Sequence, residues 1–149
     1  MVSIDELKAS LGDLAKEIKT DKSGKAWVFV ELDKLKKLLS LLRIDGYGHL
    51  STITGYDDGE KIQLMYHLIK FNDKGSNDIN VVTFTDRENS VAPSILDLYP
   101  SALVYEREVF DLLGVRFEGH KGLKRLLLPE DVPEDFHPLR KDFKINVEG

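Results

Sequence analysis

The residues with the greatest capacity for chemistry lie near the C-terminal end of the chain, between Tyr105 and Phe143. This stretch reads YEREVFDLLGVRFEGHKGLKRLLLPEDVPEDFHPLRKDF and contains two histidines, four arginines and no cysteine. Acids and histidines serve in acid–base catalysis or as metal ligands, and arginines bind carboxylates or phosphates. Three kinds of site are therefore possible: a catalytic site, a metal or phosphate site, or a surface for another protein.

The first two glutamates of this stretch do not form a catalytic pair. Glu106 and Glu108 are two residues apart on an expected helix, so their side chains point about 200° apart. Two acids that act on one substrate must flank it. Because these two diverge, the sequence predicts no catalytic residue.

A metal site would use His120 and His137 together with Asp135 or Asp142. The 17-residue step between the two histidines is not a recognised ligand spacing. A phosphate site would use the glycines of EGHKG and the HPLRK run, but no glycine loop opens a helix here. We therefore expect no metal and no cofactor in this chain. A stand-alone metal-dependent enzyme that uses His120 and His137 stays open as an alternative.

A third helix is expected over residues 101–113. Pro100 suits its first turn, and Gly114 suits the position just past its end. The apolar residues surround the helix axis instead of forming one stripe, which indicates burial on most sides. These residues are Ala102, Leu103, Val104, Tyr105, Val109, Phe110, Leu112 and Leu113.

Charges inside such a helix need partners, because unpaired buried charges are strongly disfavoured. In one interpretation Arg107 pairs with Asp111 along the helix, and the glutamates reach solvent. In the other, a glutamate or Arg107 meets an opposite charge on another chain. The sequence leaves both interpretations open.

The segment after Gly114 is predicted to be an extended, irregular tail, residues 115–149. Three prolines interrupt it and no period is sustained, yet it is too rich in leucine and phenylalanine for disorder. We expect another protein to cover this apolar surface. Forked arginine contacts fit that role, and the candidates are Arg107, Arg116, Arg125 and Arg140.

The upstream residues predict a two-layer α+β domain in the order α-β-α-β-β-β, with its helices on one face of the sheet. A capping box at Ser3–Glu6 starts a helix that is expected to end near Thr20, and Asp33 can cap a second that ends around Arg43 to Gly46. The expected strands are 26–32, 49–54, 60–71 and 79–85. The expected units are an α+β domain at 1–92, a third-helix region at 93–114 and a partner-binding tail at 115–149.

The composition excludes several classes of protein. The chain has no cysteine, which removes disulfides and iron–sulfur ligands. Its net charge of −5 argues against a nucleic-acid binder. No apolar run reaches the length of a membrane span, and the first residues do not resemble a signal peptide. We therefore expect a cytoplasmic chain, and the excess of lysine over arginine with a single glutamine is typical of thermophiles.

Three ordered motifs carry a resemblance to a known family. EREVFDLLGVRFEGH, LKRLLLPED and HPLRKDF closely resemble the signature of the thirty-kilodalton (C-type) subunit of respiratory complex I. The same family includes subunits of archaeal membrane-bound hydrogenases, sulfur-reducing complexes and F420H2 dehydrogenases. One departure is Lys121, where the family usually has proline, and its role is unexplained.

The resemblance implies a cofactor-free structural subunit in the peripheral arm of a complex I-related oxidoreductase, on the cytoplasmic side of the membrane. It implies that this chain clamps the large hydrogenase-like subunit beside the small iron–sulfur subunit. The clusters, and any NiFe or quinone site, would lie in those partners. An interaction module unrelated to redox chemistry is a further alternative. The expected partner-binding residues are Glu106, Arg107, Glu108, Phe110, Gly114, Phe117, Gly119, His120, Arg125, His137, Pro138, Leu139, Arg140 and Lys141.

Overall fold

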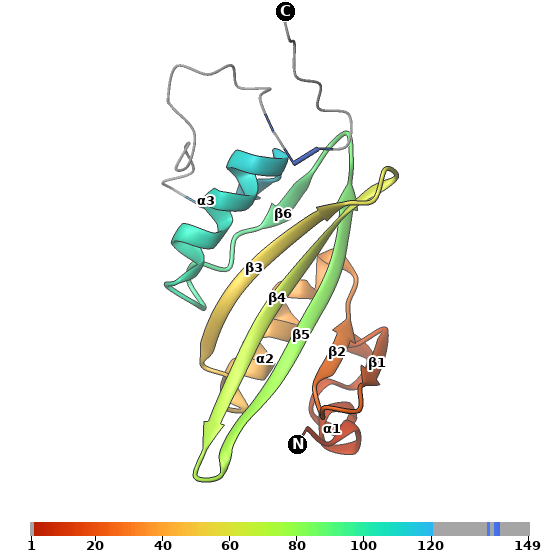
Figure 1. Cartoon of the computed structure of the whole chain (residues 1–149), viewed down its shortest axis with the longest axis vertical. Coiled ribbons are helices and arrows are strands. Elements are labelled where there is room, and N and C mark those ends of the chain that lie inside the picture. Colours follow the sequence, from red (N-terminus) through yellow and green to blue (C-terminus); the bar gives the residue numbers. More distant parts are fainter. Residues whose placement is uncertain (1, 121–136, 138, 141–149) are drawn as a thin grey trace, which may run out of the picture.

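The structure of the chain is a computed structural model that describes residues 2–120, 137, 139 and 140. Within these residues the main sheet has five strands in the order β1-β2-β5-β4-β3. They are β1 (Glu17–Thr20), β2 (Ala26–Phe29), β3 (His49–Asp57), β4 (Lys61–Asn72) and β5 (Gly75–Asp86). Neighbouring strands are antiparallel except β2 and β5, which are parallel. Figure 1 shows β3, β4 and β5 as long, twisted strands side by side.

One face of this sheet is buried in the hydrophobic core. Side chains alternate between the two faces of a strand, so every second residue of β4 points to the same side. The buried ones are Ile62, Leu64, Tyr66 and Leu68. The residues between them are half-exposed. This alternation is the pattern expected of a sheet that is covered by helices on one side.

The helices supply the second layer. They are α1 (Ile4–Leu11), α2 (Leu35–Ile44) and α3 (Ala102–Leu113). Four leucines of α2 recur at helical spacing and belong to the core: Leu35, Leu38, Leu39 and Leu42. Figure 1 shows α2 behind the strands, and the contacts of α3 are made mainly with β3. The predicted α+β class is therefore confirmed.

The predicted first helix is too long. It begins as expected, since Ser3 Oγ accepts a hydrogen bond from the Glu6 N–H at 3.4 Å. It ends at Leu11 because Gly12 takes a positive φ of 55° as the C-cap. A short 3₁₀ turn (Gly12–Leu14) follows, and the residues predicted to complete the helix form the edge strand β1 instead.

A small second sheet connects the core domain with the segment after α3. Strand β6 (Val91–Pro93) pairs in parallel with β7 (Arg116–Glu118), and neither strand is predicted from the sequence. Both Val115 and Phe117 are buried in the core. The first residues of the predicted tail are therefore part of the fold, and β6 spans the predicted boundary at 92/93.

Strand β3 and helix α3 approach each other closely at Gly55. A Cβ atom added there would lie 2.3 Å from Leu113 Cδ1 and 3.4 Å from Val109 Cγ1. Gly55 is in register with Leu64 of β4, whose side chain lies on the covered face. Helix α3 therefore packs on the same face of the sheet as the core.

We expect Gly55→Ala to lower the free energy of unfolding by about 1–3 kcal/mol, because Leu113 is buried and has to leave its packed position. The measurement is urea unfolding of the isolated chain. The matched control is Gly48→Ala, because a Cβ at Gly48 meets no atom within 4 Å. Equal stability of the two variants would contradict the close approach of α3 to β3.

Candidate functional site

Glu106 is the centre of a buried hydrogen-bond cluster on the core side of α3, here called the Glu106 cluster. Its Oε1 accepts a hydrogen bond from Ser94 Oγ at 2.6 Å and lies 2.8 Å from His120 Nδ1. Its Oε2 accepts a hydrogen bond from the Ile95 N–H at 2.9 Å. Because a carboxylate only accepts hydrogen bonds, His120 Nδ1 is the donor in its pair. The side chains of Glu106 and His120 both have 0% exposure.

The local backbone brings these residues together. The parallel pairing of β6 and β7 continues into a hydrogen bond from the Ser94 N–H to Glu118 O at 2.8 Å. Gly119 then turns the chain with a φ of 90°, and the His120 N–H donates to Phe117 O at 3.2 Å. The turn returns the imidazole of His120 to α3, where it meets Glu106.

The Glu106 cluster has a structural role in this geometry. A buried carboxylate is tolerated when hydrogen-bond donors surround it, and Glu106 has three. Burial, together with the nearby Glu106 carboxylate, raises the pKa of the Tyr66 hydroxyl well above its usual range. Because the side chains of Glu106 and His120 are fully buried, they do not reach solvent. The cluster holds the chain that leaves β7 against α3.

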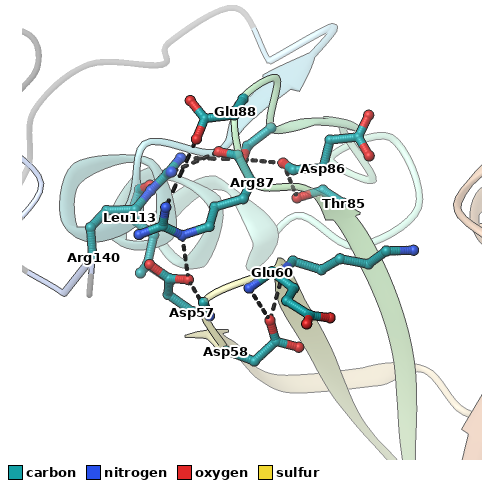
Figure 2. Close-up of polar contacts among 12 residues, drawn as sticks. Asp57, Asp58, Glu60, Thr85, Asp86, Arg87, Glu88, Leu113 and Arg140 are labelled. Carbon is teal, nitrogen blue, oxygen red and sulfur yellow. Dashed lines mark hydrogen bonds and ion pairs between the residues drawn. The ribbon is translucent and has the colours of Figure 1, made fainter. Parts of the chain in front are cut away.

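A second connection joins Arg140 to the core domain, and Figure 2 shows it. The guanidinium donates to three groups of the same chain. Its Nε donates to Leu113 O at the end of α3, and Nη1 donates to Arg87 O at 2.6 Å. Its Nη2 donates to Ser90 Oγ at 3.2 Å. Arg140 thus links the end of α3 to the loop between β5 and β6.

That loop is held by a buried ion pair that sequence reasoning missed. Arg87 Nε lies 2.8 Å from Asp57 Oδ1, and the Asp57 side chain has 0% exposure. In Figure 2, Arg87 extends from the loop after β5 towards Asp57 at the end of β3. The two residues are thirty positions apart, so no local pattern of charges indicates the pair. The Asp57–Arg87 pair sets the position of Arg87 O, which Arg140 contacts.

His137 and Leu139 also contact the C-terminal end of α3. His137 Nδ1 lies 3.2 Å from Asp111 O, and the Leu139 N–H donates to Leu112 O at 2.9 Å. Gly114 has a φ of 79°, and a Cβ atom there would lie 2.8 Å from His137 Cδ2. Position 114 therefore requires glycine for two reasons: the backbone is left-handed there, and a Cβ atom would clash with His137. Together with Arg140, these contacts satisfy carbonyl groups at the helix terminus.

The structure departs from the interpretation in which Arg107 pairs with Asp111 and the glutamates of α3 reach solvent, whereas a charge contact with another chain stays a prediction. Glu106 is buried instead of reaching solvent, and Asp111 is buried as well. Among the described residues no ion pair joins Arg107 to an acid, and Arg107 Nε is buried without an acceptor. The two exposed residues of α3 are apolar, Leu103 at 40% and Val104 at 42%.

The described part of the chain contains no cluster of side chains that could bind a metal ion. No group of three or more histidine, aspartate or glutamate side chains is close enough there to hold an ion. The Nδ1 atom of His120 faces Glu106, and that of His137 faces a backbone carbonyl. Asp135 and Asp142, the acids considered with these histidines, lie outside the described residues.

The structure places most of the predicted partner-binding residues around α3. Phe117 is buried in the core, Phe110 is half-buried with its ring 6.3 Å from that of His137, and Glu108 is half-buried. Arg125, Pro138 and Lys141 lie outside the described residues. Contacts within one chain do not test contacts between chains, so partner binding by all of these residues stays a prediction.

Comparisons with known proteins identify the family. Residues 28–148 match the model of the respiratory-chain NADH dehydrogenase 30 Kd subunit, a span that includes most of the sheet, α3 and the tail. The chain belongs to this family, as its three motifs indicated. It is 42% identical over 123 residues to the C-type subunit of the NADH-quinone oxidoreductase of Moorella thermoacetica, with 80% of each protein covered.

Two further relatives extend the comparison to archaeal complexes. The chain is 32% identical to the membrane-bound hydrogenase subunit beta of Pyrococcus furiosus, with 85% of this chain and 76% of that protein covered. It also resembles a chain in the structure of the membrane-bound sulfane sulfur reductase, an archaeal respiratory membrane complex. There the TM-score is 0.84 at 27% identity, with 96% of this chain and 84% of the other covered. These relatives are subunits of complex I-like membrane complexes.

The described part of the chain has no helix that is both long enough and apolar enough to cross a membrane.

Proposed function

We propose that this chain is a structural subunit of a complex I-related, membrane-bound oxidoreductase. In this proposal α3 and the tail clamp the large hydrogenase-like subunit, next to the small iron–sulfur subunit. The observation that carries the proposal is the family match, which runs through α3 and the tail as well as the sheet. The relatives support it, because they are named as subunits of NADH-quinone oxidoreductase and of a membrane-bound hydrogenase.

The geometry of α3 supports a mechanical role. The Glu106 cluster fixes the chain where it leaves β7, and Arg140 fixes it again at the end of α3. Both attachments use side chains whose contacts are made inside the chain. A clamp that is held in place before it meets its partner loses less conformational entropy on binding. This chain would therefore set the spacing of its neighbours and perform no redox step itself.

Under this proposal the cofactors belong to the neighbouring subunits. The absence of cysteine from the sequence supports this division, because the common iron–sulfur clusters are held by thiolates. The chain would be peripheral, attached through its partners to the cytoplasmic side of the membrane. It would influence electron transfer only through the distances between clusters that its partners hold.

The test compares hydrogen exchange in the chain alone and in the purified complex. We expect residues 115–143 to gain protection on assembly, because the proposal places them against the large subunit. Peptides from β4 and β5 are the internal control, because these strands are already buried in the isolated chain. Equal protection of residues 115–143 in the two samples would refute the clamp. A tagged pull-down from the native membrane identifies the subunits that accompany the chain.

A further inference from the structure

Three residues on the outward side of α3 have the properties of a protein-binding patch. Leu103 and Val104 are 40% and 42% exposed, although they are large and apolar. Arg107 follows them by four and three positions, so its side chain lies about 40° and 60° from theirs around the helix axis. The three residues, here called the Arg107 patch, therefore share one face on adjacent turns.

The guanidinium of Arg107 lacks a partner within the part of the chain that the structure describes. Its Nε atom is buried and has no hydrogen-bond acceptor. The acids on neighbouring turns do not supply one. Asp111 is buried without an ion pair to Arg107, and Glu106 is occupied by Ser94, Ile95 and His120. A buried donor without an acceptor raises the free energy of the isolated chain, and a partner that supplies an acceptor would remove this cost.

The chemistry of the missing partner follows from the guanidinium. Arginine presents a rigid fork of N–H donors that matches the two oxygens of a carboxylate. Flanking apolar side chains exclude water and strengthen such a pair, which is the usual environment of an arginine hot spot in an interface. Leu103 and Val104 are placed to provide this exclusion.

We propose that the Arg107 patch binds an aspartate or glutamate side chain, surrounded by apolar residues, on the large subunit of the complex. The proposal rests on the proposed function, which supplies the large subunit as the neighbour of α3. It goes further because it assigns a carboxylate to Arg107 and adds Leu103 and Val104 to the contact. The positive charge of Arg107 and the apolar border beside it both favour this occupant.

The first experiment separates binding from folding with the Arg107→Met variant. Methionine spans the arginine side chain only as far as the Nε position, so it keeps the apolar stem and removes the unpaired donors. We expect the isolated variant to be as stable as the original chain or more stable, while its dissociation constant from the large subunit rises about tenfold or more. Lys37→Met is the matched control, because Lys37 is an exposed cation on α2, outside the proposed contact, and should leave both measurements unchanged.

The second experiment identifies the carboxylate directly. Arg107→Lys places an ammonium group at the same position, and a carbodiimide joins an amine to a carboxylate that touches it. In the assembled complex we expect a cross-link between position 107 and an acid of the large subunit. A variant with alanine at both 103 and 104 should weaken assembly without changing the unfolding midpoint by more than a few degrees.

The outcomes distinguish this proposal from the proposed function. If the unchanged chain does not assemble with a large subunit, the proposed function fails. If that chain assembles but Arg107→Met assembles equally well, only the Arg107 patch is refuted. A loss of stability in isolated Arg107→Met also refutes the patch, with or without a partner, because it gives Arg107 an internal role. A cross-link to an acid of this same chain refutes it too.

Discussion

Replacing Glu106 by alanine is expected to lower the free energy of unfolding by about 3–5 kcal/mol, because three buried donors lose their common acceptor. Ser94 Oγ, the Ile95 N–H and His120 Nδ1 cannot turn to water, since the cluster is buried. The loss would be a large fraction of the stability of a domain of this size. The measurement is urea unfolding of the isolated chain at neutral pH.

Two variants make the Glu106 result specific. Glu106→Gln keeps one acceptor oxygen, so it should cost less than the alanine variant. Glu108→Ala removes a half-exposed carboxylate from the same helix, and we expect a change within about 0.5 kcal/mol. If the alanine variants at 106 and 108 were equally stable, Glu106 would not be the acceptor that the geometry describes. Assembly of Glu106→Gln reports whether the cluster also positions the clamp.

Replacing Arg140 by alanine is expected to destabilise the isolated chain by about 1.5–3 kcal/mol, because hydrogen bonds from a charged donor to Leu113 O, Arg87 O and Ser90 Oγ disappear. Amide exchange should accelerate at Leu139, whose N–H is bonded to the end of α3. Chemical unfolding and hydrogen exchange of the isolated chain provide the two measurements.

A comparison of the stability of the isolated variant with its assembly into the complex shows whether Arg140 acts within this chain or on the partner. Sequence reasoning assigned it to the partner, in which case Arg140→Ala would weaken assembly and leave the isolated chain stable. The structure gives it three internal acceptors, so both quantities should fall together. Arg140→Lys keeps the charge but not the fork, and we expect it to recover little of the loss. If both variants were as stable as the original chain, the internal contacts of Arg140 would be refuted and its role would be in partner binding.

Local sequence patterns predicted much of the fold. Helix α3 ends at Gly114 as expected, because a glycine with positive φ is a local requirement. Strands β3, β4 and β5 were located because the turn sequences GYDDGE and NDKGSND separate three runs of apolar residues. The first helix was predicted wrongly because Ile18 continues its apolar spacing, whereas Gly12 ends the helix and Ile18 lies in an edge strand.

The site was less accessible to sequence reasoning because its contacts are non-local. The pattern correctly indicated that the charges of α3 need partners. The partners of Glu106 include side chains twelve and fourteen residues away, through the unpredicted pairing of β6 and β7. Arg140 reaches Arg87 across more than fifty residues, and Asp57 reaches Arg87 across thirty. Periodicity describes a helix face but not the loops that pack on it.

The parallel pairing of β2 with β5 constrains the order in which the chain folds. Ala26 lies opposite Ile79, more than fifty residues later, so β2 has no neighbour on that side until β5 has been synthesised. The hairpins β3–β4 and β4–β5 close over short turns and form early, whereas the β2–β5 pair must close a long loop. We therefore expect β1 and β2 to join the sheet late, and a nascent chain that ends before β5 would have an unpaired edge on β2.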